Sequence, residues 1–338
     1  MRIVTVVGAR PQFVKAATVS RQIIALNDRL PSAEDRVTEI IVHTGQHYDA
    51  EMSDIFFKEL QIPAPQHNLG VGSGSHAFQT ARMLEGIEKV LLAERPEMVL
   101  IYGDTNSALA GALAAAKLHI PIAHVEAGLR SRNRKMAEEI NRIVADHLAS
   151  FLFCPVQAAV ENLRQEGITQ GVFFVGDVMY DSLIFNLELA SVTSKVLEVL
   201  NLPPQSYYLA TVHRAENTDD LTRLRAIFRA LNQLDAIVVL PMHPRTRKII
   251  YEDHPSAFLS ELDNLMVIEP QGYLDALVLQ RHAKMILTDS GGMQKEAYFL
   301  GRPCITLRDE TEWGETVAAG WNIVVGADDR KILEAVER

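Results

Sequence analysis

The sequence predicts an α/β protein with two doubly wound, Rossmann-like domains, each built on a parallel sheet. First, its 338 residues are enough for two domains of about 150 to 170 residues. Second, short β-branched runs alternate with longer amphipathic segments along the whole chain, which is the pattern of parallel βαβ units. Third, glycine turns directly follow several of these runs, as expected where a strand ends and a helix begins.

The expected strands are short and bounded by Gly, Pro or polar residues. In the first half they are 2–7, 40–43, 98–102, 121–125, 151–154 and 172–175. In the second half they are 207–212, 237–240, 266–268, 285–287, 304–307 and 323–325. Amphipathic helical patterns separate them, such as 78–92, 105–118 and 221–234. We expect one long helix over 179–204 to join domains 1–178 and 179–338, with a ligand bound in the interdomain cleft at the carboxyl ends of the strands.

Composition excludes several classes of partner. A net charge of −10 argues against nucleic acid and anionic membrane surfaces, which need a cationic footprint. Cys154 and Cys304 lie in apolar, strand-like runs, which favours reduced, buried thiols in the cytoplasm. The N-terminus is typical of a first strand rather than a signal peptide, and no apolar run approaches the ~20 residues of a membrane span. His43 and His47 flank a turn without a third ligand, so no metal site is expected.

The stretch TDSGGMQKEA (288–297) follows an apolar run and precedes a helical pattern. A helix that starts there directs its first N–H groups and its positive dipole end at the strand edge, which favours a phosphate. Gly291 and Gly292 let an anion approach the backbone, and Ser290 supplies a hydroxyl. Glu296, about one turn further, is suited to accept hydrogen bonds from a ribose. An ordinary turn with Ser290 as its N-cap is the alternative.

Charged residues follow the expected strands of the first half. Arg10 and Lys15 come after the first strand and a glycine turn, where they can contact a diphosphate or a sugar. Asp104 follows another strand, and alone it is best explained as the N-cap of the next helix. Glu126 leaves a strand for a glycine turn with no evident helix start or salt partner, which favours a functional role. Glu138 opens a helix, where an acid commonly stabilises the first turn.

Two histidines follow strands of the second half. His213 comes directly after the strand at 207–212, and it is a candidate general acid or phosphate donor, with capping as the alternative. His243 is the residue nearest a strand end in the basic stretch 241–248, whose other charges are expected on a solvated helix face.

Nine sequence blocks, taken in order, resemble the UDP-N-acetylglucosamine 2-epimerases from end to end. The blocks are GARPQFVK (8–15), HTGQHYD (43–49), GDTNS (103–107), HVEAGLRS (124–131), EEINR (138–142), TVHRAEN (211–217), MHPRT (242–246), TDSGGMQKEA (288–297) and RDETEW (308–313). The resemblance implies the glycosyltransferase-B architecture, a UDP-sugar in the cleft, no nicotinamide or other cofactor, no metal, and a homodimer. It also implies a last helix that packs back on the first domain.

The same resemblance assigns roles to individual residues. The positions that match the catalytic residues of the family are Asp104, Glu126, Glu138 and His213. Positions that match its UDP contacts are Arg10, Ser290, Gly291, Gly292 and Glu296, to which we add Lys15, Arg130 and His243 as substrate contacts. Gln46 and His47 match a segment that touches a second, activating UDP-sugar in bacterial members.

The implied reaction is epimerisation at C2 of a UDP-HexNAc by elimination of UDP and re-addition. Because C2–H is not beside a carbonyl, departure of UDP is needed to make it acidic, and two faces of the sugar require at least two acid/base groups. A hydrolysing epimerase and an epimerase of a diacetamido-uronic acid are alternatives, the latter because Arg132 lies in a loop, 131–137, that departs from the family pattern. A glycosyltransferase shares the fold but needs an acceptor groove, for which the sequence has no signal.

Overall fold

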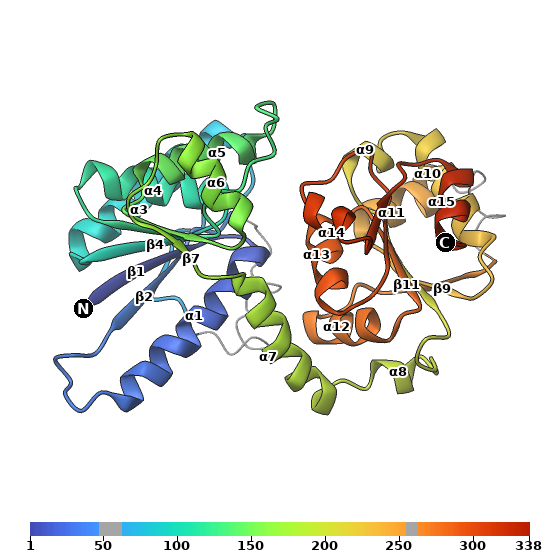
Figure 1. Cartoon of the computed structure of the whole chain (residues 1–338), viewed down its shortest axis with the longest axis horizontal. Coiled ribbons are helices and arrows are strands. Elements are labelled where there is room, and N and C mark those ends of the chain that lie inside the picture. The colour runs from blue at the N-terminus through green and yellow to red at the C-terminus, as the bar shows by residue number, and fades with distance from the viewer. Residues whose placement is uncertain (47–62, 255–257, 259–262) are drawn as a thin grey trace. The chain divides into compact units, whose positions relative to one another are not determined.

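The computed structural model describes residues 1–46, 63–254, 258 and 263–338 (Figure 1). It divides into two compact units, Met1–Ser182 and Leu183–Arg338. Each unit has its own parallel sheet, its own helical layers and its own hydrophobic clusters, and the two are described separately below.

The sheet of the first unit has seven parallel strands in the order β3-β2-β1-β4-β5-β6-β7. Its strands are β1 (Arg2–Val7), β2 (Thr38–His43), β3 (His67–Asn68), β4 (Met98–Tyr102), β5 (Ile122–Val125), β6 (Phe151–Cys154) and β7 (Val172–Phe174). The helices that accompany them are α1 (Arg10–Arg29), α3 (His76–Glu94), α4 (Asn106–Lys117), α5 (Ala137–Leu148) and α6 (Gln157–Gln165). α3, α4 and α5 cover one face, where Val4 and Val6 pack with Met83 and Ala112, and Figure 1 shows α1 on the other face.

The sheet of the second unit has six parallel strands in the order β10-β9-β8-β11-β12-β13. Its strands are β8 (Tyr208–Thr211), β9 (Val238–Pro241), β10 (Leu265–Ile268), β11 (Met285–Thr288), β12 (Cys304–Thr306) and β13 (Asn322–Val324). Its longer helices are α10 (Leu221–Asn232), α12 (Tyr273–His282), α13 (Gly291–Phe299) and α15 (Asp329–Val336). The short ones are α8 (Val196–Val199), α9 (Ala215–Thr218), α11 (Pro244–Lys248), the π-helical η1 (Ile249–Asp253) and α14 (Gly314–Ala318).

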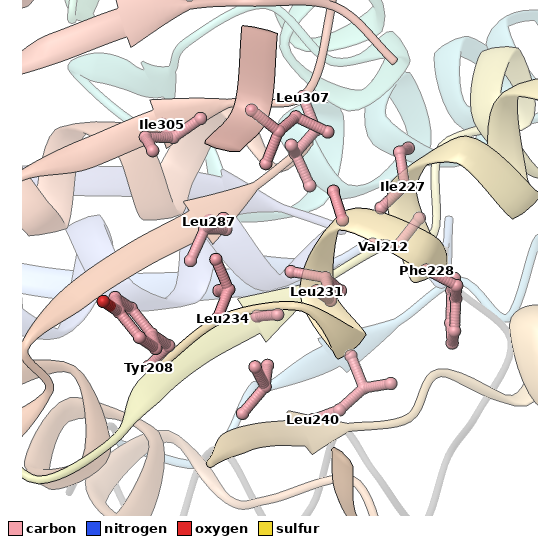
Figure 2. Packing of buried hydrophobic residues seen from close by; sticks show 14 of the residues in the cluster. Tyr208, Val212, Ile227, Phe228, Leu231, Leu234, Leu240, Leu287, Ile305 and Leu307 are labelled. Atoms are coloured by element: carbon pink, nitrogen blue, oxygen red, sulfur yellow. The ribbon is translucent and has the colours of Figure 1, made fainter. Parts of the chain in front are cut away.

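Apolar side chains are buried on both faces of this second sheet. On one face, Ile227, Phe228 and Leu231 of α10 pack against Leu240 and Leu287 of the strands (Figure 2). On the other face, a separate cluster joins residues of α8, α12 and α13 to the sheet, namely Val196, Leu279, Ala297, Leu209, Val239 and Ile286. Burial on both sides explains why these strands are continuous apolar runs rather than alternating ones.

All twelve predicted strands are present, each within two residues of its predicted ends. β3 was not predicted, because its two residues, His67 and Asn68, carry no apolar pattern. The prediction of two doubly wound parallel sheets is therefore confirmed.

The prediction of one long helix over 179–204 was wrong. α7 (Val178–Thr193) ends before Ser194, and the short α8 follows. Hydroxyls compete for helical carbonyls in this stretch, because Ser191 and Thr193 donate to the carbonyl oxygens of Glu188 and Leu189. Ser194 donates to Asp275 Oδ1 and accepts from the N–H of Val196, which restarts the chain in a new direction.

The expected packing of the last helix on the first domain stays a prediction. α15 packs against α10 within its own unit, where Ile332 and Ala335 are buried beside Leu224 and Phe228. Arg229 of α10 pairs with Asp329 at the start of α15.

Each sheet has a point where the strand order reverses, between β1 and β4 in the first unit and between β8 and β11 in the second. Doubly wound sheets bind ligands outside the carboxyl ends of the strands at this switch point. The turns that begin at Gly103 and at Asp289 lie there, so the fold brings Asp104 of the first unit and Ser290 of the second to a switch point.

In the described ranges, no group of three or more His, Cys, Asp or Glu side chains is arranged to hold a metal ion. No helix within those ranges has the length and apolar character needed to cross a membrane.

Candidate active site

Glu126 lies at the carboxyl end of β5 and is paired with Lys15. The Lys15 ammonium, on α1, contacts Glu126 Oε2, and both side chains are about nine-tenths buried, with exposed fractions of 9% and 10%. This salt partner was not evident in the sequence. Gly103 packs against this pair: a Cβ added there would lie 3.0 Å from Glu126 Oε2 and 3.2 Å from Lys15 Nζ. The turn that carries Asp104 thus adjoins the Glu126 carboxylate.

Asp104 does not cap α4. The Thr105 hydroxyl accepts from the N–H of Ala108 and provides the cap. The Asp104 carboxylate instead pairs with the guanidinium of Arg142 on α5. Its side chain keeps 35% exposure, so a ligand can reach the carboxylate. Interpreting Asp104 as a cap was wrong because the next residue, a threonine, takes that role.

The two carboxylates influence each other. Burial raises the pKa of Asp104, the Arg142 guanidinium opposes this, and the nearby charge of Glu126 raises the pKa further. Each acid has its own cation, since Lys15 pairs with Glu126 and Arg142 with Asp104. Two adjacent carboxylates at one site are the groups that acid/base chemistry on both faces of one carbon requires.

Glu138 and Glu139, at the start of α5, have different environments. Glu138 is exposed, and within the described residues it has no hydrogen-bond or ion-pair partner. Glu139 is 1% exposed, and it accepts from Ser131 N and Oγ and from Arg132 N at 2.8–2.9 Å. Glu139 thus holds the 131–132 turn, while the proposed role of Glu138 stays a prediction.

The other predicted contacts of the first unit are placed as follows. The Arg130 guanidinium donates to Asp146 and Glu166, and these acids outweigh the effect of burial and raise its pKa. Gln46 Oε1 accepts from Ser107 N and Oγ at 3.1 and 2.7 Å, at the start of α4. Arg10 begins α1, but its side chain lies outside what the structure describes, as does His47 altogether.

Asp289 organises the histidine turn of the second unit. Its fully buried carboxylate accepts from His213 N and Arg214 N at 2.9 Å and from Asn217 Nδ2 at 3.1 Å. His213 Nδ1 lies 3.3 Å from Asp289 Oδ1, and the ring keeps 33% exposure. Burial lowers the pKa of His213, and Asp289 opposes this shift. The carboxylate orients the ring so that Nε2 is the nitrogen left to meet a ligand.

His243 stacks on His213, with ring centroids 5.4 Å apart. Its Nδ1 accepts from the N–H of Arg245 at 3.2 Å and caps α11. Burial, followed by the charge of Arg245, lowers the pKa of His243. Because Nδ1 accepts, the ring proton lies on Nε2, which can then donate to a ligand. Arg245, Arg247 and Lys248 are exposed, which confirms the predicted solvated helix face.

Ser290 is the N-cap of α13, where its hydroxyl accepts from the N–H of Met293 at 3.4 Å. Gly292 is exposed, and a Cβ added to it meets no atom within 4 Å, so the backbone is open to an anion there. At Gly291 a Cβ would meet the Glu312 carboxylate. Glu296 is half-buried, and its Oε2 accepts from Gln280 Nε2 at 2.8 Å. The helix start therefore combines a cap, open backbone and a nearby acid, as a nucleotide diphosphate site requires.

Comparison with known proteins identifies the family. Residues 31–338 match the family model described as UDP-N-acetylglucosamine 2-epimerase. A Methanococcus maripaludis protein named as a homolog of that enzyme is 54% identical over 100% of this chain and 92% of its own length. The UDP-2,3-diacetamido-2,3-dideoxy-D-glucuronate 2-epimerase of Pseudomonas aeruginosa is 50% identical over 99% and 91% of the two chains. The chain belongs to the UDP-N-acetylglucosamine 2-epimerase family.

A solved structure extends the comparison to the fold. The crystal structure of Methanocaldococcus jannaschii UDP-GlcNAc 2-epimerase, in complex with UDP-GlcNAc and UDP, is similar with a TM-score of 0.88 and 44% identity, covering 100% of this chain and 92% of that one. The protein thus has the two-domain glycosyltransferase-B fold of these epimerases.

Sequence reasoning missed three residues that shape the site. Arg142 lies four residues after Glu138 and three after Glu139, a helical spacing that places it on the same side of α5 as these acids. Asp289 directly follows β11, and Asn217 closes the TVHRAEN block. The strand-end position of Asp289 was a usable signal, whereas the partner of Arg142 depends on how α5 packs.

Proposed function

We propose that this protein interconverts UDP-GlcNAc and UDP-ManNAc without releasing free sugar, as a non-hydrolysing 2-epimerase. The observation that carries the proposal is the pair of carboxylates, Asp104 and Glu126, which adjoin across Gly103 and are paired with Arg142 and Lys15. Epimerisation needs one group to remove the C2 proton and another to return a proton to the opposite face. Glu138, exposed at the start of α5, is the third candidate acid.

In the proposed reaction the C1–O bond breaks first, and UDP leaves with the bonding electrons. Positive charge at C1 acidifies C2–H, a carboxylate accepts that proton, and a 2-acetamidoglucal forms. The second acid then protonates the other face of C2 while UDP adds back to C1. The two carboxyl groups recover their starting protonation by exchange with solvent, so atoms and charge balance over the cycle. Lys15 and Arg142 keep the two carboxylates in place, and Arg142 opposes the rise in the pKa of Asp104.

The departing diphosphate carries the largest change of charge, so it needs prepositioned donors. The start of α13, with its exposed Gly292, and the Nε2 atoms of His213 and His243 are the donors that we assign to it. Glu296 is assigned to the ribose. This assignment requires that a single UDP-sugar reaches the residues of both units.

The test is to incubate the protein with UDP-GlcNAc and separate the products by anion-exchange chromatography. We expect UDP-ManNAc and UDP-GlcNAc to reach a constant ratio with no free UDP accumulating. Free ManNAc with stoichiometric UDP would instead identify a hydrolysing enzyme, and an unchanged substrate would contradict both.

A second candidate substrate is UDP-2,3-diacetamido-glucuronate. It is favoured by the 50% identical relative that bears this substrate in its name and by the exposed, basic loop that contains Arg132, Arg134 and Lys135. A carboxylated sugar is a natural partner for such cations. Comparing kcat/KM for the two UDP-sugars decides between them, and Arg132→Ala should lower kcat/KM for the uronic acid alone.

We also propose that the protein is a homodimer, as the family resemblance implies. Light scattering coupled to size-exclusion chromatography tests it, with twice the 37.6 kDa chain mass as the expected result.

A further inference from the structure

A buried histidine–aspartate pair lies behind the two turns that carry Asp104 and Glu126. His124 of β5 and Asp146 of α5 both have side chains with 0% exposure. His124 Nδ1 lies 2.7 Å from Asp146 Oδ1, and its Nε2 lies 2.8 Å from the carbonyl oxygen of Gly103. Neither residue has a role in the proposed reaction, yet a buried polar pair is costly unless its bonds are all made.

Both partners of the His124 ring accept hydrogen bonds. The Gly103 carbonyl can only accept, so Nε2 must carry a proton. Asp146 Oδ2 already receives the N–H of Gly128 at 3.0 Å and Arg130 Nη1 at 2.6 Å. Because Oδ2 accepts from a guanidinium and a backbone N–H, Asp146 is ionised. Nδ1 must then donate as well.

The surrounding charges match a protonated ring. Arg130, which pairs with Asp146, also donates from Nε and Nη2 to the Glu166 carboxylate at 2.7 and 2.8 Å. The chain His124, Asp146, Arg130 and Glu166 therefore alternates in sign when the imidazole carries both protons. Alternation leaves no uncompensated charge in the interior, where a single unpaired ion is strongly destabilising.

We propose that His124 is a positioning residue that donates from both ring nitrogens and fixes the Asp104 turn relative to the Glu126 turn. The N–H of Gly103 donates to Val125 O at 3.0 Å, and the Gly103 carbonyl receives His124, so two polar backbone groups beside Asp104 are tied to β5. Through Asp146, the same network holds Gly128 at the end of the Glu126 turn. The kinetic consequence rests on the proposed epimerase function.

The ring protonation can be measured without any substrate. In protein labelled with ¹⁵N-histidine, a two-bond ¹H–¹⁵N spectrum at neutral pH should show one histidine with both ring nitrogens at protonated frequencies. Loss of this signal in His124→Gln assigns it. One unprotonated nitrogen on His124 would overturn the proposal.

Kinetics test the positioning role. His124→Gln keeps an amide donor that can serve Gly103, whereas His124→Phe keeps a ring and removes both donors. We expect kcat to fall about 10-fold in the first and about 10²-fold in the second, with KM within about twofold, because misplacing a reacting group by about 1 Å has effects of this size. His119→Gln, at an exposed histidine in the turn after α4, is the matched control and should retain wild-type kcat.

The following outcomes distinguish a failure of the proposed role of His124 from a failure of the proposed epimerase function. If both folded variants retain wild-type kcat, or lose only melting temperature, His124 has no positioning role. If His124→Phe does not fold, His124→Gln and the NMR spectrum decide. If the wild-type protein epimerises neither UDP-sugar, the proposed function fails, and the NMR result alone decides the state of His124.

Discussion

Glu126 has a backbone that acids rarely adopt, with φ at +69°. Such a conformation costs about 1–3 kcal/mol and persists where the surroundings impose it. Here the N–H groups of Glu126 and Ala127 both donate to Phe153 O at 3.1 Å, and Lys15 holds the side chain. This backbone conformation places the carboxylate beside Gly103, in a fixed position of the kind that a reacting group needs.

The first prediction concerns this carboxylate. Glu126→Gln keeps the shape but removes the base, so kcat should fall about 10² to 10⁴-fold while UDP affinity is retained. Steady-state kinetics and calorimetric titration with UDP measure the two effects. Glu85→Gln, which alters an exposed helical ion pair with Lys89, is the control. If Glu126→Gln lowered stability but kept turnover, Glu126 would only shape the turn and would not act in catalysis.

The second prediction uses the Arg142–Asp104 pair. Burial raises the pKa of Asp104 and Arg142 opposes the rise, so Arg142→Met should raise this pKa further. If Asp104 accepts the C2 proton it must be ionised, and the acidic limb of the kcat/KM profile should move to higher pH. An unmoved limb would show that Asp104 is not the base. Arg82→Met, at an exposed pair with Glu85, should leave the profile unchanged.

At the residue scale the sequence identified the acids but not their partners. Glu126 was singled out because it follows an apolar strand without a local reason to be there. Its partner Lys15 lies 111 residues away, and their contact follows from β1, β4 and β5 being neighbours in the sheet, which sequence spacing does not encode. Asp104 resembled a cap because Asp and Thr share that preference.

Among the elements, α5 contributes charged residues on one side at several turns. Glu139, Arg142 and Asp146 are buried at spacings of three and four residues, and they contact the 131–132 turn, Asp104 and His124 in that order. One helix thereby holds two loops and strand β5 in place at one edge of the site.

A third prediction follows for this helix. Burial raises the pKa of Glu139, but hydrogen bonds from Ser131 and Arg132 and the charge of Arg142 outweigh it, so the pKa lies below its ordinary value of 4.5. Its stabilisation is then fully present above about pH 4.5 and is lost as pH falls through the lowered folded-state pKa. Glu139→Gln should cost about 1–3 kcal/mol at neutral pH.

Thermal melts at neutral and acidic pH measure this effect. The difference in Tm between wild type and Glu139→Gln should shrink as the pH falls below 4.5. Glu334→Gln, on an exposed position of α15, should melt as the wild type throughout. A Tm difference that does not change with pH would contradict the charged, hydrogen-bonded state of Glu139.

A fourth prediction concerns the start of α13. A methyl group on Gly292 meets no protein atom within 4 Å, so Gly292→Ala should fold with unchanged or slightly raised Tm, since Ala favours helix. If the diphosphate approaches this backbone, UDP affinity should fall about 10-fold or more. Gly314→Ala, at the equally open first position of α14, is the matched control. Unchanged UDP affinity in Gly292→Ala would show that the diphosphate does not bind at the start of α13.

Strands were predictable because strands buried on both faces are continuous β-branched runs. β3 was not, because a two-residue edge strand has no pattern of its own. The break between α7 and α8 was missed because hydroxyl side chains at Ser191, Thr193 and Ser194 changed the hydrogen bonding without changing the apolar periodicity.

Over the whole molecule, each unit concentrates its polar chemistry at its own switch point. The first unit supplies paired carboxylates and cations, and the second supplies two histidines, a buried aspartate and an open helix start. The alternation of strands and helices was enough to predict two such sheets. The sequence pattern did not predict the order of the strands in each sheet. Because strand order decides which site residues are neighbours, their contacts could not be predicted either.

The central claim, that carboxylates move the C2 proton of a UDP-bound sugar, is tested most directly by proton NMR of the reaction in D₂O. The protein incubated with UDP-GlcNAc should place deuterium at C2 of UDP-ManNAc, because the second acid, which protonates the opposite face, carries a deuteron taken from the solvent. The same experiment with the diacetamido-uronic acid covers the second substrate. UDP-ManNAc that forms while retaining protium at C2 would contradict the account.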